Sequence, residues 1–128
     1  MIHTRLAQPE QAAAHHRQAI TIYRENGDRD GEARALNGLG EAARANGRHT
    51  DALPHHTDAL TIAEDIGNPG QQARAHSGLG DAHRALDDTG RAVRCYERAL
   101  ALYSELGMPE ADGVRASLSL LTGCRPQP

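Results

Sequence analysis

The sequence has no tryptophan, no phenylalanine and no lysine, and it has only three tyrosines along its whole length. This scarcity excludes a globular core of the ordinary kind, in which aromatic side chains supply much of the buried area. Hydrophobic residues make up 38% of the chain, and alanine is the most frequent of them. Burial must therefore come from small side chains that let backbones approach closely, and this inventory favours helices packed on helices.

An excess of positive charge is also absent. The formal net charge is −3, whereas nucleic-acid-binding domains are usually strongly basic. No stretch approaches the roughly 18 consecutive apolar residues of a membrane span, and residues 1–10 lack the apolar run of a secretory signal. We therefore expect a cytoplasmic protein with no membrane partner and no direct nucleic-acid partner.

Cysteine is scarce, because Cys95 and Cys124 are the only two in the sequence. They are too few and too differently placed for a disulfide framework or a four-ligand zinc site. Cys95 falls on a helix face of the buried type, which favours an inert packing role, whereas Cys124 lies in the tail and is expected to be an exposed thiol. The sequence also lacks a nucleophile elbow, a phosphate-binding loop and a His-Glu-x-x-His motif. We predict that the protein is not an enzyme and carries no cofactor.

The sequence does contain an internal repeat with a period of about 40 residues, which is the signature of a repeat architecture. Aligning residues 31–70 with residues 71–110 gives 14 identities. They include the motif Gly38-Leu39-Gly40, which matches Gly78-Leu79-Gly80, and a glycine and a proline at the end of each unit. The repeat therefore predicts two copies of one structural unit.

The same offset extends beyond the two copies. Residues 12–27 match residues 52–67 at seven positions, so the chain begins inside a repeat. Residues 114–121 resemble the opening of a further unit, either at the unchanged offset or with a shift of one residue. These two registers stay open.

Within each unit the apolar residues recur every three or four positions, which is typical of a helix with one buried face. Glycines mark helix ends, and a following proline suits the first turn of the next helix. Pro54 lies near the first turn of its own helix, and we expect it to delay or bend that start. The predicted helices are 9–26, 31–46, 50–66, 70–86, 90–106 and 110–122.

These marks resemble the tetratricopeptide repeat family in its longer form of about 40 residues per unit. Leu39-Gly40 and Leu79-Gly80 look like the Leu-Gly pair of the family's first helix, and the alanines Ala52, Ala59, Ala92 and Ala99 look like the pair in its second helix. The resemblance implies an all-α superhelix, a solenoid of antiparallel helix pairs. One domain is expected over 1–122, with a half repeat at 9–30, repeats at 31–70 and 71–110, a terminal helix at 110–122 and a flexible tail at 123–128.

The stretch Ala99 to Ala111 is also similar to repeats at the carboxyl end of large actinomycete transcriptional regulators. The resemblance implies a protein–protein interaction module, with a regulatory or scaffold role in a larger protein. Stacked helix pairs leave a concave groove lined by first helices, and in the family this groove binds a peptide or protein segment. The matching positions are Arg34, Asn37, Glu41, Arg44, Arg74, Ser77, Asp81 and Arg84.

Two arginines per unit on this face would grip carboxylates of an acidic peptide or a chain terminus. The competing interpretation is that Arg34, Glu41 and Arg44 form solvated charge pairs on their own helix. Two other functions also stay open. One is a sensor of a small molecule or signalling peptide, and the other is self-association through exposed terminal helices, which would give a homo-oligomer.

Eight histidines raise the question of a metal site, especially at His15-His16 and His55-His56. Adjacent helical residues diverge by about 100°, whereas zinc-binding pairs on one helix prefer a spacing of four. His16, His56 and Tyr96 are equivalent in the repeat, so we predict that the imidazoles replace an aromatic filler between helices and that no metal is bound. Partly buried imidazoles resist protonation, which predicts a looser stack near pH 5 to 6.

Overall fold

The computed structural model describes residues 3–123, with side chains from residue 8 onward, residue 9 excepted. Every regular element in this range is a helix, which confirms the predicted all-α fold. The predicted boundaries agree to within two residues for all helices but the first, which begins six residues earlier than expected. The helices are α1 (His3–Asn26), α2 (Arg29–Ala45), α3 (His49–Ile66), α4 (Pro69–Ala85), α5 (Thr89–Glu105) and α6 (Glu110–Thr122).

Short side chains and glycines set the helix ends. Asp28, Asn68 and Asp88 each precede a helix and accept a hydrogen bond from a backbone N–H in its first turn, which satisfies a donor that the helix itself leaves unpaired. Gly47 has a φ of 75°, and Asp87 takes the same place in the next unit with a φ of 63°. Asp87 is the only residue of the described range other than glycine with positive φ. The repeat therefore keeps its turn geometry even where the glycine is lost.

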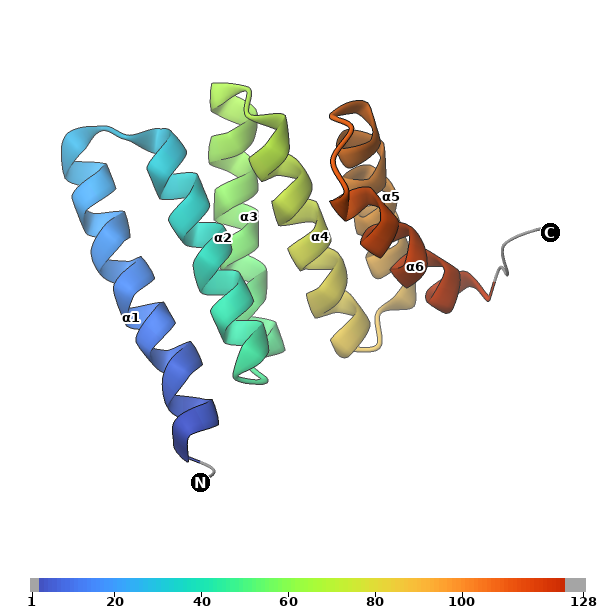
Figure 1. Ribbon diagram of the computed structural model, residues 1–128, viewed down its shortest axis with the longest axis horizontal. Helices are drawn as coiled ribbons and strands as arrows, with labels where there is room; N and C mark the ends of the chain where they lie inside the picture. The colour runs from blue at the N-terminus through green and yellow to red at the C-terminus, as the bar shows by residue number, and fades with distance from the viewer. Residues whose placement is uncertain (1–2, 124–128) are drawn as a thin grey trace.

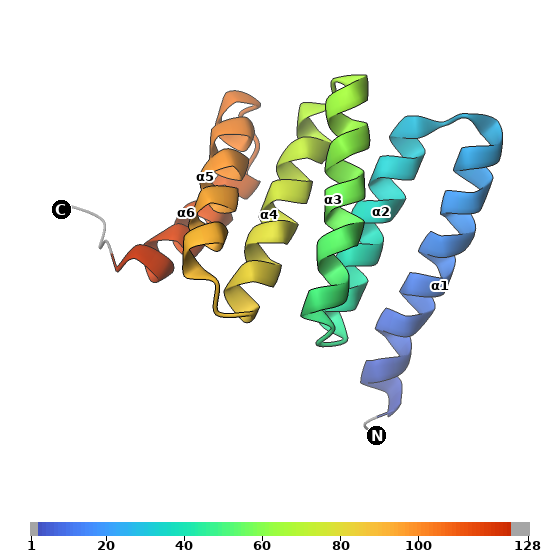
Figure 2. The same cartoon turned by 180° about the vertical axis from the view of Figure 1, so that it is seen from behind.

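Successive helices pack as antiparallel neighbours along the chain. We call α2, α4 and α6 the first helices and α1, α3 and α5 the second helices, as in the repeat unit. Figure 1 looks onto α2, α4 and α6, and Figure 2, from behind, brings α3 and α5 to the front. First helices α2 and α4 also contact each other directly, so their shared surface forms one continuous face.

Glycines in the first helices receive ring side chains from the second helices. A Cβ added to Gly40 would lie 2.3 Å from the His56 ring, one at Gly78 would also lie 2.3 Å from that ring, and one at Gly80 would lie 2.7 Å from Tyr96. His56 and Tyr96 are each only 1% exposed. His56 and Tyr96 are thus the predicted ring fillers between helices, and any side chain at the glycines that they contact would separate the helices.

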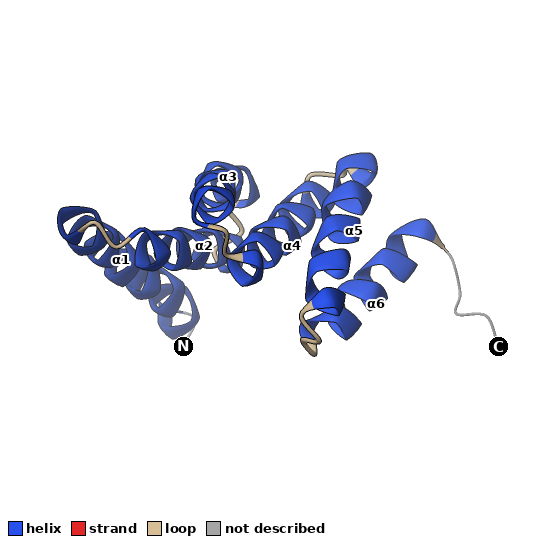
Figure 3. Cartoon of the chain, turned by 90° about the horizontal axis from the view of Figure 1, so that it is seen from above, coloured by secondary structure: helices blue, strands red, loops and turns tan. Residues whose placement is uncertain are grey.

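The carboxyl end of the array departs from the repeat. Figure 3 shows the carboxyl end of α6 pointing away from α5. Leu120 is 79% exposed, although its counterpart under the one-residue shift, Leu79, is buried.

Pro54 does not delay its helix, because α3 begins five residues before it. Cys124 and the predicted tail after Gly123 lie outside the described residues.

Candidate functional site

The first-helix face carries the residues that the sequence singled out, and their charges pair between units. Arg74 Nε donates to Glu41 Oε2 at 2.8 Å, and Arg74 Nη2 donates to Glu41 Oε1 at 2.6 Å. This two-pronged contact raises the pKa of the Arg74 guanidinium and ties α2 to α4. Glu41 thus pairs with the next unit rather than with Arg34 or Arg44 on its own helix.

Asp81 is the second centre of charge on this face. Its carboxylate lies 3.8 Å from Arg44 Nε and 3.6 Å from Arg84 Nη2, and it accepts a hydrogen bond from the Tyr96 hydroxyl. The Arg84 guanidinium also lies 5.9 Å from the centre of the Tyr96 ring, within range of a cation–π contact. Burial and the bond to Asp81 raise the Tyr96 pKa. Two guanidinium groups therefore share one carboxylate, and both have donors left over.

The remaining predicted residues divide between surface and interior. Arg34 is exposed and pairs with Asp30 at 3.1 Å on its own helix, and Ser77 is half-buried. Asn37 is fully buried, with 0% exposure. The structure therefore places Asn37 behind the face and not on it, so it makes no surface for a ligand.

Asn37 instead holds a buried hydrogen-bond network across two units. Its Nδ2 donates to Gln71 Oε1 at 3.0 Å and to the Gln71 carbonyl at 3.2 Å, and its Oδ1 lies 2.8 Å from His56 Nδ1. Because Oδ1 only accepts, Nδ1 must donate, which fixes the neutral His56 tautomer. Burial lowers the His56 pKa to about 4. His56 is thus a neutral structural imidazole in the fold.

A groove of about 270 Å³ opens between α4 and α6 beside Asp81. Tyr103 and Val114 give it apolar surface, and Glu110 and Ser117 make it partly polar. The sequence did not indicate the α6 side of this groove, because the two possible registers of the last helix gave its residues no definite equivalents. The groove is lined by Ser77, Asp81, Tyr103, Glu110, Gly113, Val114 and Ser117.

The histidines and Cys95, which the sequence raised as candidates for metal binding or thiol chemistry, have no such site around them in the described residues. Within residues 3–123 no three His, Cys, Asp or Glu side chains gather where a metal ion would fit. Cys95 is half-buried, and burial raises the pKa of its thiol, which works against thiolate chemistry. No helix in the described part of the chain combines the length and apolar character that crossing a bilayer requires.

Comparison with known proteins agrees with this architecture. A family model described as the tetratricopeptide repeat matches residues 1–65 and residues 32–105. No curated protein matches the chain. Repeats of this family are non-catalytic and generally mediate protein–protein interaction. With its two glycine-marked units and a family match over most of its length, the chain belongs to the tetratricopeptide repeat family.

Proposed function

We propose that the first-helix face binds a peptide segment of a partner protein, with an acidic group of that segment on Arg44 and Arg84. One observation carries this proposal: guanidinium groups from two successive first helices converge on the single carboxylate of Asp81. Two positive charges against one negative charge favour a further carboxylate at this point. Arg74 contributes less, since Glu41 already neutralises it with two hydrogen bonds.

The groove between α4 and α6 gives the segment a second point of contact. Asp81 lines this groove and at the same time pairs with Arg44 and Arg84. A segment whose carboxylate reaches these arginines would therefore lay its neighbouring residues against Tyr103 and Val114. The charge contact would set the position of the segment, whereas packing in the groove would add little apolar burial, because Tyr103 and Val114 are only 6% and 5% exposed in the fold.

The resemblance of the repeat to regulator sequences supports a regulatory or scaffold role within a larger protein. In such a role the array would present this face to another protein or to another part of the same one. Transcriptional regulation and a cytoplasmic location belong to this proposal.

A displayed library of random peptides would test the face directly. We expect enriched peptides to share an acidic residue and to lose at least about tenfold in affinity on R44A/R84A, equal to roughly 1.4 kcal/mol or more. The matched control is Arg29→Ala, which removes an exposed arginine paired with Asp65 at 3.3 Å, away from the groove. Peptides that bind the wild type and R44A/R84A equally would refute the proposed face.

Self-association is a second candidate, and exposed apolar residues at both ends of the array favour it. Ile22 on α1 is 54% exposed although its equivalent Ile62 is 8% exposed, and Leu120 on α6 projects into solvent. Such side chains are suited to contact between copies. Sedimentation velocity should show dimers or longer stacks that I22S/L120S reduces to monomers. A wild-type chain that stays monomeric at high concentration would exclude this function.

A further inference from the structure

The opposite side of the array contains a cleft that the peptide-binding proposal does not use. It lies between second helices α3 and α5, above α4, and encloses about 290 Å³. Leu60 and Leu79 supply apolar surface, and Arg91, Arg94 and Arg98 line it along α5. The arginines are three and four residues apart, so they share one face of that helix.

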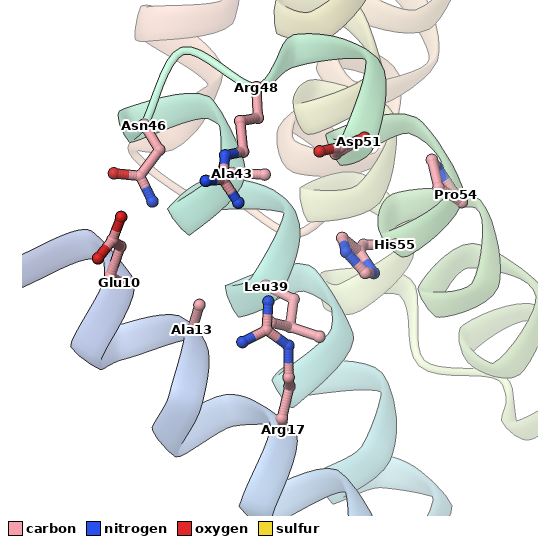
Figure 4. A pocket seen from close by; sticks show the side chains of 10 residues that line it. All are labelled: Glu10, Ala13, Arg17, Leu39, Ala43, Asn46, Arg48, Asp51, Pro54 and His55. Carbon is pink, nitrogen blue, oxygen red and sulfur yellow. The ribbon is translucent and has the colours of Figure 1, made fainter. Parts of the chain in front are cut away.

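The repeat itself shows that this charge is particular to one cleft. The equivalent cleft of the preceding unit lies between α1 and α3, above α2 (Figure 4). There Asp51 and Pro54 stand where the second cleft has Arg91 and Arg94. The fold therefore explains the hollow in both units, whereas the charge differs between them.

The third arginine, Arg98, also replaces a residue that is not basic in the preceding unit. Arg98 corresponds to Asp58 in the preceding unit, so an acidic residue again gives way to arginine. The three positions together carry a charge of −2 in the first copy and +3 in the second. The first cleft also mixes signs, because Glu10 and Arg17 line it.

The arginines of the second cleft are largely unneutralised. Arg91 pairs with Asp88 at 3.5 Å. Arg94 and Arg98 form no ion pair or hydrogen bond with any residue that the structure describes, and no acidic side chain lines the cleft. The cleft therefore holds a net charge of about +2 next to an apolar surface.

We propose that this cleft binds a compact phosphate monoester. A phosphate monoester carries a charge between about −1.5 and −2 at pH 7 and has three strong acceptor oxygens, which matches the charge of the cleft better than a single carboxylate does. Guanidinium groups bind phosphate oxygens through paired hydrogen bonds. The organic part of the ligand lies over Leu60 and Leu79. The cleft volume of about 290 Å³ lies just below the range of about 300 to 1,000 Å³ for small-molecule pockets, which limits the ligand to a compact one.

Phenyl phosphate is a suitable probe because it joins one phosphate to a compact apolar ring. Titration calorimetry should give one site per chain and an affinity at least about tenfold higher than that for inorganic phosphate. R94Q/R98Q should weaken phenyl phosphate binding at least about tenfold. R29Q/R115Q removes two exposed arginines elsewhere, each in an ion pair, and should change the affinity less than twofold.

Circular dichroism melts will show that both double variants fold, which is expected because the replaced side chains are exposed. The single variant Arg91→Gln, with an intermediate loss, provides a second test. Equal binding of phenyl and inorganic phosphate would overturn the role of the apolar surface. Absence of saturable binding, or equal losses in the two double variants, would overturn the site. Binding of a glutamate-rich peptide in place of phenyl phosphate would also overturn it and assign the cleft to a protein partner.

Discussion

Acidification should destabilise the fold through His56, the ring held between Gly40 and Gly78. The ring is 1% exposed, and burial is the main reason why its pKa falls from 6.5 to about 4. Asn37 already accepts the proton of Nδ1, so a second proton must go to Nε2. That nitrogen lies on the edge of the ring that faces both glycines, where the added charge has little solvation.

The direction of the pH effect follows from the difference between the folded and unfolded chains. In the unfolded chain His56 takes up a proton near pH 6.5, whereas the folded chain resists protonation until about pH 4. The stability due to the neutral ring is therefore fully present above pH 6.5 and is lost as the pH falls toward 4. A shift of this size corresponds to about 3 kcal/mol in full, and about 2 kcal/mol of it is lost between pH 8 and pH 5.

Urea unfolding at pH 8 and pH 5, followed by circular dichroism, measures this loss. His16, His76 and His83 also have pKa values lowered by burial, so the whole chain should lose more than the share of His56. The variant His56→Gln isolates that share, because its unfolding free energy should change about 2 kcal/mol less between the two pH values than that of the wild type.

The neighbouring variant His55→Gln is the matched control, because it removes an imidazole from the same helix but not the ring that lies against Gly40 and Gly78. It should leave the pH dependence of the wild type in place. A wild type that keeps its unfolding free energy at pH 5 to within about 0.5 kcal/mol, the size of an ordinary surface effect, would refute this role of His56. The same pH dependence in His56→Gln and His55→Gln would refute it as well.

Two further substitutions test the packing and the turn. Gly40→Ala should destabilise the fold by about 1 to 3 kcal/mol through overpacking. Its control is Gly113→Ala, whose Cβ would meet no atom within 4 Å and which should stabilise the fold by about 0.5 to 1 kcal/mol. Equal effects of the two variants in urea unfolding would contradict overpacking at Gly40. Asp87→Gly should raise stability by about 1 kcal/mol, because its positive φ costs an L-residue energy that glycine avoids; a lower melting temperature for this variant would show that the Asp87 side chain compensates.

Much of the fold follows from the spacing of small residues. The repeated Gly-Leu-Gly motif marked equivalent points in two units, and the equivalence of His56 with Tyr96 indicated a ring between the helices, which the structure places against Gly40 and Gly80. Such contacts repeat because each unit meets its neighbour in the same way. The packing of helix α6 was less predictable than its bounds. Its residues match the repeat in two registers, and its carboxyl end points away from the array.

The candidate site was harder to predict, because helical spacing shows which residues share a helix face but not how deeply each side chain is buried. Asn37 shares a helix face with Arg34 and Glu41, yet its short amide lies behind that face against Gln71 and His56. Longer side chains at the neighbouring positions reach the surface, and a short polar one does not. Charge partners were equally hidden, because Glu41 pairs with Arg74 of the next unit and not with the arginines of its own helix.

The double glycine contact of His56 makes residues 31–70 a module that is compatible with itself. The His56 ring needs Gly40 of its own copy and the glycine that the following copy supplies, which is Gly78 in this chain. Gly38 is the equivalent of Gly78, so residues 31–70 supply both glycines. Inserting extra copies of this segment would therefore lengthen the array without new joints.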